Sequence, residues 1–132
     1  MAEPDAHTLV SSARDLMRVE SAGSAGLGPR AAAMLGRQAL ELAMQSVWAV
    51  TAPGMDRMKL RPQLLCLGTL LDDRELGQRV TWAFHLLSDA CHHGVYDLPP
   101  SSTELTAALE TVWSLADAAE RLRAAVRHQL PK

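Results

Sequence analysis

The chain has 132 residues, of which 48% are hydrophobic, 21% charged and 4% aromatic, and its formal net charge at neutral pH is −2. Ala and Leu occur 21 times each and Ile is absent, so helix-forming residues far outnumber the β-branched and aromatic residues that strands prefer. This composition excludes an all-β fold and a disordered chain. The length suits one hydrophobic core, and we predict a single all-α domain over residues 1–132.

The net charge and the cysteines limit the partners and the compartment. A charge near zero provides no general attraction to nucleic acid or to an anionic membrane, so any RNA contact has to be local. Cys66 and Cys91 lie within apolar helical patterns, and no second pair suggests a disulfide framework. Neither a transmembrane stretch nor a signal peptide is present. We therefore expect a cytoplasmic protein with reduced thiols.

The hydrophobic spacing predicts four long helices and one short helix, with recognisable start signals. Asp5 can cap the first helix, and Pro29 and Pro62 suit the beginnings of the second and third. Asp72 or Asp73 can cap the fourth helix, and Gly94 is a typical residue just beyond a helix end. Ser101 and Glu104 have the spacing of a capping box at the start of the last helix. The expected helices cover residues of about 5–20, 29–51, 62–71, 73–93 and 101–128.

The predicted second helix is apolar around most of its circumference. Its polar face consists essentially of Arg37, Glu41 and Gln45, at successive steps of four residues. Trp48 lies within the apolar arc and is expected in the core. So wide an apolar arc is typical of a helix at the centre of a bundle or of one that forms a dimer.

Polar side chains gather at the end of the predicted fourth helix. His85, Asp89 and His92 follow one another at i, i+4 and i+7, so they share a helix face. Such a stripe can bind a transition metal or form an acid/base pair. The alternative is a solvated helix end, where protonated histidines interact favourably with the helix dipole. A structural zinc site would need more ligands, and no second cluster of ligand residues follows in the sequence.

Three stretches resemble an actinobacterial branch of the HEPN superfamily: Arg30–Glu41, Leu64–Leu67 and Ala90–Pro100. The resemblance implies a small helical bundle that forms homodimers. HEPN domains include ribonucleases, toxins paired with nucleotidyltransferase antitoxins, and non-catalytic modules that bind RNA or nucleotides. Active members carry an Arg, followed after four to six residues by a His, and a common subset continues with any residue and a Tyr.

The resemblance implies that the catalytic pair of the family is substituted in this chain. When the family Tyr is placed on Tyr96, the family His falls on Gly94 and the family Arg on Asp89. Gly94 has no side chain for proton transfer, and the carboxylate of Asp89 would repel a phosphate. The resemblance therefore favours a non-catalytic domain, in which Asp89 and Tyr96 mark a binding region. Tyr96 can alternatively act as a packing lid on the bundle.

A ribonuclease remains the alternative function. Arg79 and His85 satisfy the short Arg-to-His spacing, although on an ideal helix they point about 120° apart. His92 and His93 each lie within one turn of Gly94 and can replace the missing imidazole. The candidate catalytic residues for a metal-independent endoribonuclease are therefore Arg79, His85, His92 and His93.

Further candidate binding residues lie outside this cluster. Trp113 falls beside charged residues on the last helix, which suggests an interface, although a tryptophan that packs across neighbouring helices is equally expected. Arg57 and Arg61 lie in the predicted loop before the short helix and can contact RNA or a protein. Arg121, Arg123 and Arg127 suit the end of the last helix and can pair with acidic residues one turn away. No DNA-binding or mononucleotide-binding motif is present.

These observations predict a HEPN-like, non-catalytic, homodimeric binding module whose partner is a protein, RNA or a nucleotide, in a toxin–antitoxin, defence or regulatory system. We expect no cofactor and no membrane association. The first alternative is the endoribonuclease described above. The second is a metal-binding or sensing protein that uses His85, Asp89 and His92.

Overall fold

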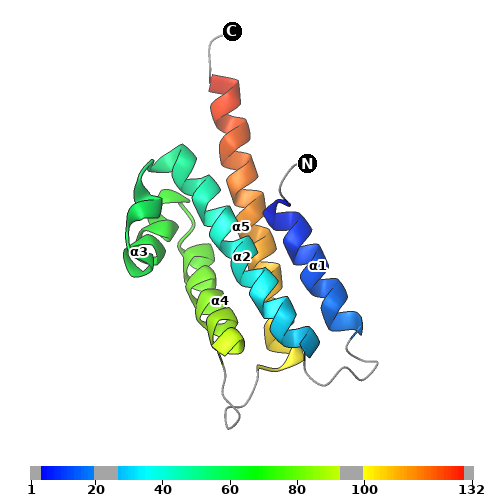
Figure 1. Ribbon diagram of the computed structural model, residues 1–132. Coiled ribbons are helices and arrows are strands. Elements are labelled where there is room, and N and C mark those ends of the chain that lie inside the picture. Colours follow the sequence, from blue (N-terminus) through cyan, green and yellow to red (C-terminus); the bar gives the residue numbers. More distant parts are fainter. Residues whose placement is uncertain (1–3, 20–26, 93–99, 130–132) are drawn as a thin grey trace.

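The computed structural model describes residues 4–19, 27–92 and 100–129 of the chain. This part of the chain is all-helical and contains no strand, which confirms the predicted fold class. Four helices form a bundle, α3 packs at one end of it, and the last turns of α5 project beyond the other helices (Figure 1). The helices are α1 (Ala6–Val19), α2 (Leu27–Thr51), α3 (Leu60–Leu70), α4 (Arg74–His92) and α5 (Ser102–Gln129), with a 3₁₀ turn, η2 (Met55–Arg57), after α2.

The predicted capping residues begin three of the helices. The Asp5 carboxylate accepts a hydrogen bond of 2.8 Å from the backbone N–H of Thr8 at the start of α1. Ser101 and Glu104 form a reciprocal capping box before α5, with two hydrogen bonds of 3.0 Å. These bonds satisfy backbone donors that lack partners within their helix.

Among the described helices, none combines the length and apolar character that crossing a membrane requires.

The alternative left open at the start of α4 is resolved in favour of Asp73. Its carboxylate accepts a hydrogen bond of 3.0 Å from the backbone N–H of Leu76. Asp72 instead adopts a left-handed backbone conformation, with φ of 54°, in the turn between α3 and α4. Aspartate tolerates this conformation better than most residues, so the adjacent acids have different backbone roles.

Two helix starts were predicted wrongly, and for the same reason. Pro29 was expected to open α2 and Pro62 to open α3, but each proline is the third residue of its helix, after Leu27 and Leu60. The backbone donors of the whole first turn have no partner within a helix, so a proline at the third position removes no hydrogen bond.

The apolar arc of α2 is covered within one chain. This helix contacts α1, α4 and α5, and α5 likewise contacts α1, α2 and α4, so α2 and α5 together form the middle of the bundle. Small residues bring the neighbouring helices close to it: at Gly36, an added Cβ would lie 2.8 Å from a methyl carbon of Leu109 and 3.2 Å from one of Leu87. Trp48 is 1% exposed, as expected of a core residue. The width of the arc therefore provides no argument for a dimer, because three helices of the same chain bury it.

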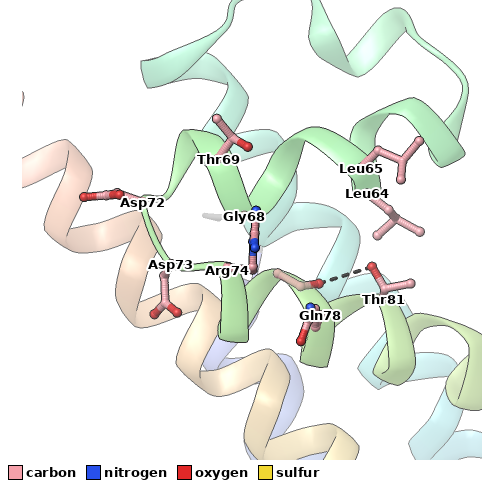
Figure 2. A pocket seen from close by; sticks show the side chains of 10 residues that line it. Leu64, Leu65, Gly68, Thr69, Asp72, Asp73, Arg74, Gln78 and Thr81 are labelled. Atoms are coloured by element: carbon pink, nitrogen blue, oxygen red, sulfur yellow. Dashed lines mark hydrogen bonds between the residues drawn. The ribbon is translucent and has the colours of Figure 1, made fainter.

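The corner between α3 and α4 depends on another close approach. Figure 2 shows Gly68 on α3 facing the start of α4. A Cβ added at Gly77 would lie 2.7 Å from the Cα and 2.8 Å from the backbone nitrogen of Gly68. The hydroxyl of Thr81 donates a hydrogen bond of 3.1 Å to the Gly77 carbonyl. The backbones thus meet where neither helix has room for a side chain.

The Gly77→Ala variant should lower the free energy of unfolding by roughly 1–3 kcal/mol, because its methyl group would force the α3 and α4 backbones apart. Denaturation by urea, followed by circular dichroism, measures the change. Gln78→Ala is the matched control, since Gln78 is exposed on the same turn and its loss should change stability by less than about 0.5 kcal/mol. Equal stabilities of the two variants would contradict the close-packing account.

The Asp5→Ala variant should destabilise the protein by roughly 1 kcal/mol at neutral pH, through loss of the α1 cap. Hydrogen bonds from Thr8 lower the pKa of Asp5 below its ordinary value of 3.8. A lowered pKa in the folded state means that the charged cap contributes stability above the ordinary pKa and loses it as the pH falls through the lowered value. Melting temperatures measured between neutral pH and pH about 2 should therefore converge for the wild type and Asp5→Asn, which caps without a charge. A constant difference would contradict the charged cap.

Candidate functional site

Two arginines and a histidine meet at a pocket between α2 and α4. The pocket has a volume of about 470 Å³ and receives side chains from the first half of α2 and from the end of α4. We call it the α2–α4 pocket. Its lining residues are Arg30, Met34, Arg37, Gln38, Glu41, Cys91 and His92.

Arg37 contacts residues on both helices that form this pocket. One of its terminal nitrogens lies 3.4 Å from His92 Nε2, and its Nε donates a hydrogen bond of 3.3 Å to a Glu41 carboxylate oxygen. Its guanidinium carbon lies 5.5 Å from the ring centre of Phe84, in a cation–π contact. A guanidinium only donates hydrogen bonds, so His92 Nε2 acts as the acceptor in this arrangement. The guanidinium therefore contacts Glu41 on its own helix and both Phe84 and His92 on α4.

The electrostatics of the pocket favour an anion. Arg30 and Arg37 both influence the thiol of Cys91: burial raises the pKa of Cys91, and the positive charges of the two arginines oppose that rise. Among the described lining residues, the one carboxylate is that of Glu41, which already pairs with Arg37. Two guanidinium groups against one carboxylate leave a net positive charge, which suits a phosphate or carboxylate ligand.

The structure does not bring the predicted His85, Asp89 and His92 stripe together as a metal site. All three side chains are exposed on α4, and within the described ranges the one group of three ligand-type side chains whose atoms lie within 4.8 Å of one another is His7, Asp117 and Glu120. His92 faces Arg37 on α2 instead. The stripe therefore shares a helix face without converging on one point.

The predicted catalytic residues are also dispersed. Arg79 and His85 are both exposed on α4, and in the part of the chain that the structure describes no hydrogen bond or ion pair joins them. His93 and Tyr96, together with Gly94 of the HEPN comparison, lie outside the described residues. Among the candidate histidines that the structure describes, His85 and His92, it is His92 that lies within hydrogen-bond distance of an arginine, Arg37.

Trp113 packs within the chain. Its indole is half-buried, and its ring centre lies 4.4 Å from that of His7 in an edge-on contact. The guanidinium carbon of Arg14 lies 5.1 Å from the centre of the same indole. Trp113 thus connects α5 to α1. Of the two roles that the sequence allowed, packing between helices and an interface with a partner, this contact is the packing role. Arg57 in η2 and Arg61 in α3 are exposed and do not line the α2–α4 pocket.

A second hollow, at the α3–α4 corner, is a weaker candidate. Its polar side chains include Asp72, Asp73, Gln78 and Thr81 (Figure 2). Asp73 caps α4 and Thr81 donates to the backbone, so these two groups have structural partners already. The hollow lies where two glycines bring the helices together, and its shape follows from that packing.

Sequence reasoning identified His92 but missed its partner. Arg37 was assigned to the polar face of α2, and no spacing rule connects it with a residue 55 positions away. The available signal was weak: Arg37 is one of few charges on a helix that is otherwise nearly apolar. A charged side chain in apolar surroundings is usually paired, and its partner can lie on another helix.

The chain matches no known protein-family model, and neither the curated proteins nor the solved structures include a significantly similar chain. The function therefore has to be argued from the geometry of the described residues.

The two cysteines should differ in reactivity toward iodoacetamide. Burial raises the pKa of Cys91, so less of the reactive thiolate is present at neutral pH, whereas Cys66 is only half-buried. We expect Cys66 to be alkylated several-fold faster, and the rate at Cys91 to rise toward alkaline pH. Mass spectrometry of the single-thiol variants Cys66→Ser and Cys91→Ser measures each rate. Faster labelling of Cys91 at neutral pH would contradict this order.

Proposed function

We propose that this protein is a non-catalytic, HEPN-like binding module, and that the α2–α4 pocket binds a phosphate group of RNA or of a nucleotide. The observation that carries the proposal is the contact of 3.4 Å between Arg37 and His92, beside Arg30 in the same pocket. A protein partner is the less favoured reading, because the pocket offers cationic donors rather than a broad apolar surface.

The residue types on α2 fit a phosphate ligand. Arg30, Met34 and Arg37 follow one another at i, i+4 and i+7, so they lie along one face of the helix. Each guanidinium can donate two parallel hydrogen bonds to phosphate oxygens. The side chain of Met34 is 53% exposed and offers an apolar surface to a ribose or a base. Donors and apolar surface thus alternate along the line that a nucleotide would follow.

The second charged neighbour, Glu41, occupies only part of the Arg37 guanidinium. Its carboxylate accepts from the Nε of Arg37. The terminal nitrogens remain available, and the one near His92 gains a stronger acceptor when a phosphate oxygen replaces the imidazole nitrogen. Binding therefore replaces the contact of Arg37 with His92 by a contact with a phosphate oxygen and does not break the Arg37–Glu41 pair.

All the named pocket residues belong to one chain, so the proposed binding requires no second copy. The homodimer that the HEPN resemblance implies stays a separate prediction. It rests on the resemblance alone, because the apolar arc of α2 has neighbours within the bundle.

A fluorescently labelled single-stranded RNA of about ten nucleotides should bind the protein, with an affinity that falls as salt is added. Arg37→Ala should weaken binding about tenfold, which is the loss expected for one charge-assisted contact. Arg30→Ala should weaken it by a similar factor. Fluorescence anisotropy measures the affinity, and competition by a nucleoside diphosphate distinguishes a nucleotide site from an RNA site.

Arg79→Ala is the matched control, because Arg79 is an exposed arginine outside the pocket and its loss removes the same charge. If Arg79→Ala and Arg37→Ala weaken RNA binding equally, the attraction is diffuse and electrostatic, and the assignment of the α2–α4 pocket as the binding site is wrong. The RNA is also analysed on a gel after incubation. Cleavage that disappears in His92→Ala or His85→Ala would establish the ribonuclease alternative and overturn the non-catalytic proposal.

A further inference from the structure

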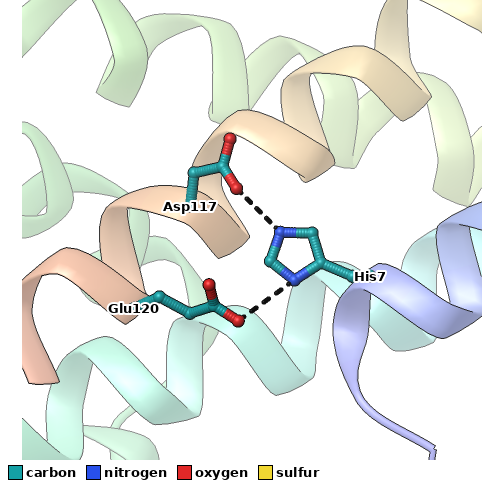
Figure 3. A group of neighbouring side chains, drawn as sticks. All are labelled: His7, Asp117 and Glu120. Carbon is teal, nitrogen blue, oxygen red and sulfur yellow. Dashed lines mark hydrogen bonds and ion pairs between the residues drawn. The ribbon is translucent and has the colours of Figure 1, made fainter. Parts of the chain in front are cut away.

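His7 on α1 lies between two carboxylates of α5. Its Nε2 is 2.8 Å from an Asp117 oxygen, and its Nδ1 is 3.4 Å from a Glu120 oxygen. Figure 3 shows both acids pointing from one face of α5 at the imidazole. Asp117 and Glu120 are three residues apart, so they occupy adjacent positions on successive turns. We call these three residues the α1–α5 cluster.

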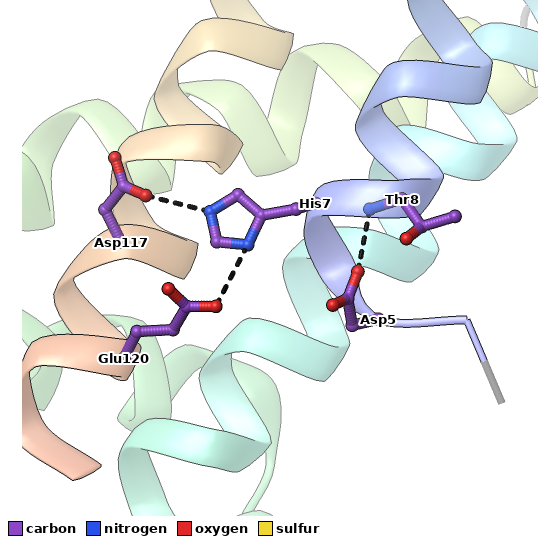
Figure 4. A network of polar contacts seen from close by, with 5 residues as sticks. All are labelled: Asp5, His7, Thr8, Asp117 and Glu120. Atoms are coloured by element: carbon purple, nitrogen blue, oxygen red, sulfur yellow. Dashed lines mark hydrogen bonds and ion pairs between the residues drawn. The ribbon is translucent and has the colours of Figure 1, made fainter. Parts of the chain in front are cut away.

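The surroundings fix the imidazole more firmly than the acids. The His7 side chain is 18% exposed, and Trp113 packs against its ring, whereas the Glu120 side chain is 65% exposed. Asp5, two residues before His7, is not one of the three ligand-type side chains, and its carboxylate accepts from the Thr8 backbone (Figure 4). In the cluster, the imidazole of His7 is packed in place, the Asp117 carboxylate lies close to it, and the exposed Glu120 side chain has room to rotate.

The two acids of the cluster do not pair with the arginines of their own helix. Arg121, Arg123 and Arg127 were expected to pair with them at spacings of three or four residues. Across the described segments, the ion pairs of Asp117 and Glu120 are with His7. The arginines instead line a hollow that also receives both acids. The orientation of the carboxylates toward a nitrogen on another helix therefore needs its own explanation.

We propose that the α1–α5 cluster is a binding site for a divalent transition metal of the zinc class, with His7 Nε2, Asp117 and Glu120 as ligands. An imidazole nitrogen and two carboxylate oxygens form a donor set that Zn²⁺ accepts, and a water completes the tetrahedron from the adjoining hollow. Mg²⁺ and Ca²⁺ fit less well, because they prefer larger sets of oxygen ligands. The site is independent of the proposed phosphate pocket, which lies between other helices.

The geometry requires a small adjustment. Zn–N and Zn–O bonds of about 2.0–2.2 Å place tetrahedral ligand atoms roughly 3.4 Å apart. The 2.8 Å between His7 Nε2 and Asp117 must therefore widen by roughly 0.6 Å. Glu120 must turn from Nδ1 toward the ion, and all three ligand atoms already lie within 4.8 Å of one another. The exposure of Glu120 leaves room for this rotation.

Metal binding competes with a proton on His7. When no metal is bound, an imidazole with both nitrogens protonated can donate to both carboxylates. On binding, the Nε2–H bond breaks, the nitrogen lone pair forms the bond to Zn²⁺, and the proton passes to water. The bound ion would join α1 to α5 at a point where they otherwise meet through side chains.

The test uses the full chain without a histidine tag, stripped of metal with a chelator. Calorimetric titration with ZnCl₂ should show one ion per chain and proton release into the buffer, and Zn²⁺ should raise the melting temperature. His7→Ala and Asp117→Asn should abolish the binding. Glu120→Gln should weaken it about tenfold or more. Co²⁺ should give visible absorption bands in the wild type that are absent from His7→Ala.

The matched controls are His85→Ala and His92→Ala, which remove exposed histidines outside the cluster and should leave Zn²⁺ binding unchanged. Circular dichroism before each titration identifies the temperature at which every variant is folded, and His7→Gln replaces His7→Ala if the latter is unfolded. The proposal is overturned if the wild type shows no saturable Zn²⁺ binding. It is equally overturned if binding survives the loss of His7 or is lost in His85→Ala.

Discussion

The burial of α2 among three other helices is the constraint on which the rest of the structure depends. A helix can be surrounded in this way only if its side chains are small where neighbours approach, and α2 has Ala32, Ala33, Gly36, Ala39 and Ala43 buried along its length. At Gly36, leucines from α4 and α5 fill the space that a side chain would need. The close approach of these helices determines which surface residues become neighbours, and both proposed sites follow from it.

The two proposed sites contain different charged groups, which the net charge of −2 does not show. Arginines gather between α2 and α4, whereas between α1 and α5 two carboxylates face a histidine, beside a hollow that Arg121, Arg123 and Arg127 also line. Salt screens exposed charges beyond roughly 8–10 Å, which limits the electrostatic effect of one site on the other. An anion site and a cation site are therefore compatible on one domain.

Local features were predictable and distant contacts were not. Asp5, Ser101 and Glu104 could be assigned as caps because a cap involves residues three positions apart. The starts at Pro29 and Pro62 were misplaced because a proline marks the first turn without fixing its first residue. The sequence pattern identified His92 as a candidate but did not predict its contact with Arg37, 55 residues away. His7 was not predicted as a site residue, because its partners lie 110 or more residues away in the sequence.

The sequence by itself determined that the chain is all-helical, and it indicated the caps of α1 and α5. It left a central position of α2 as one of two interpretations. Periodicity, capping and apolar width could be predicted because they are properties of single helices. Tertiary structure decided that three helices of the same chain cover the arc of α2, and that Trp113 packs on α1. It also decided which polar residues meet. The physical reason is that the contacts between helices depend on how side chains of different helices fit together, and a pattern along one helix does not contain that information.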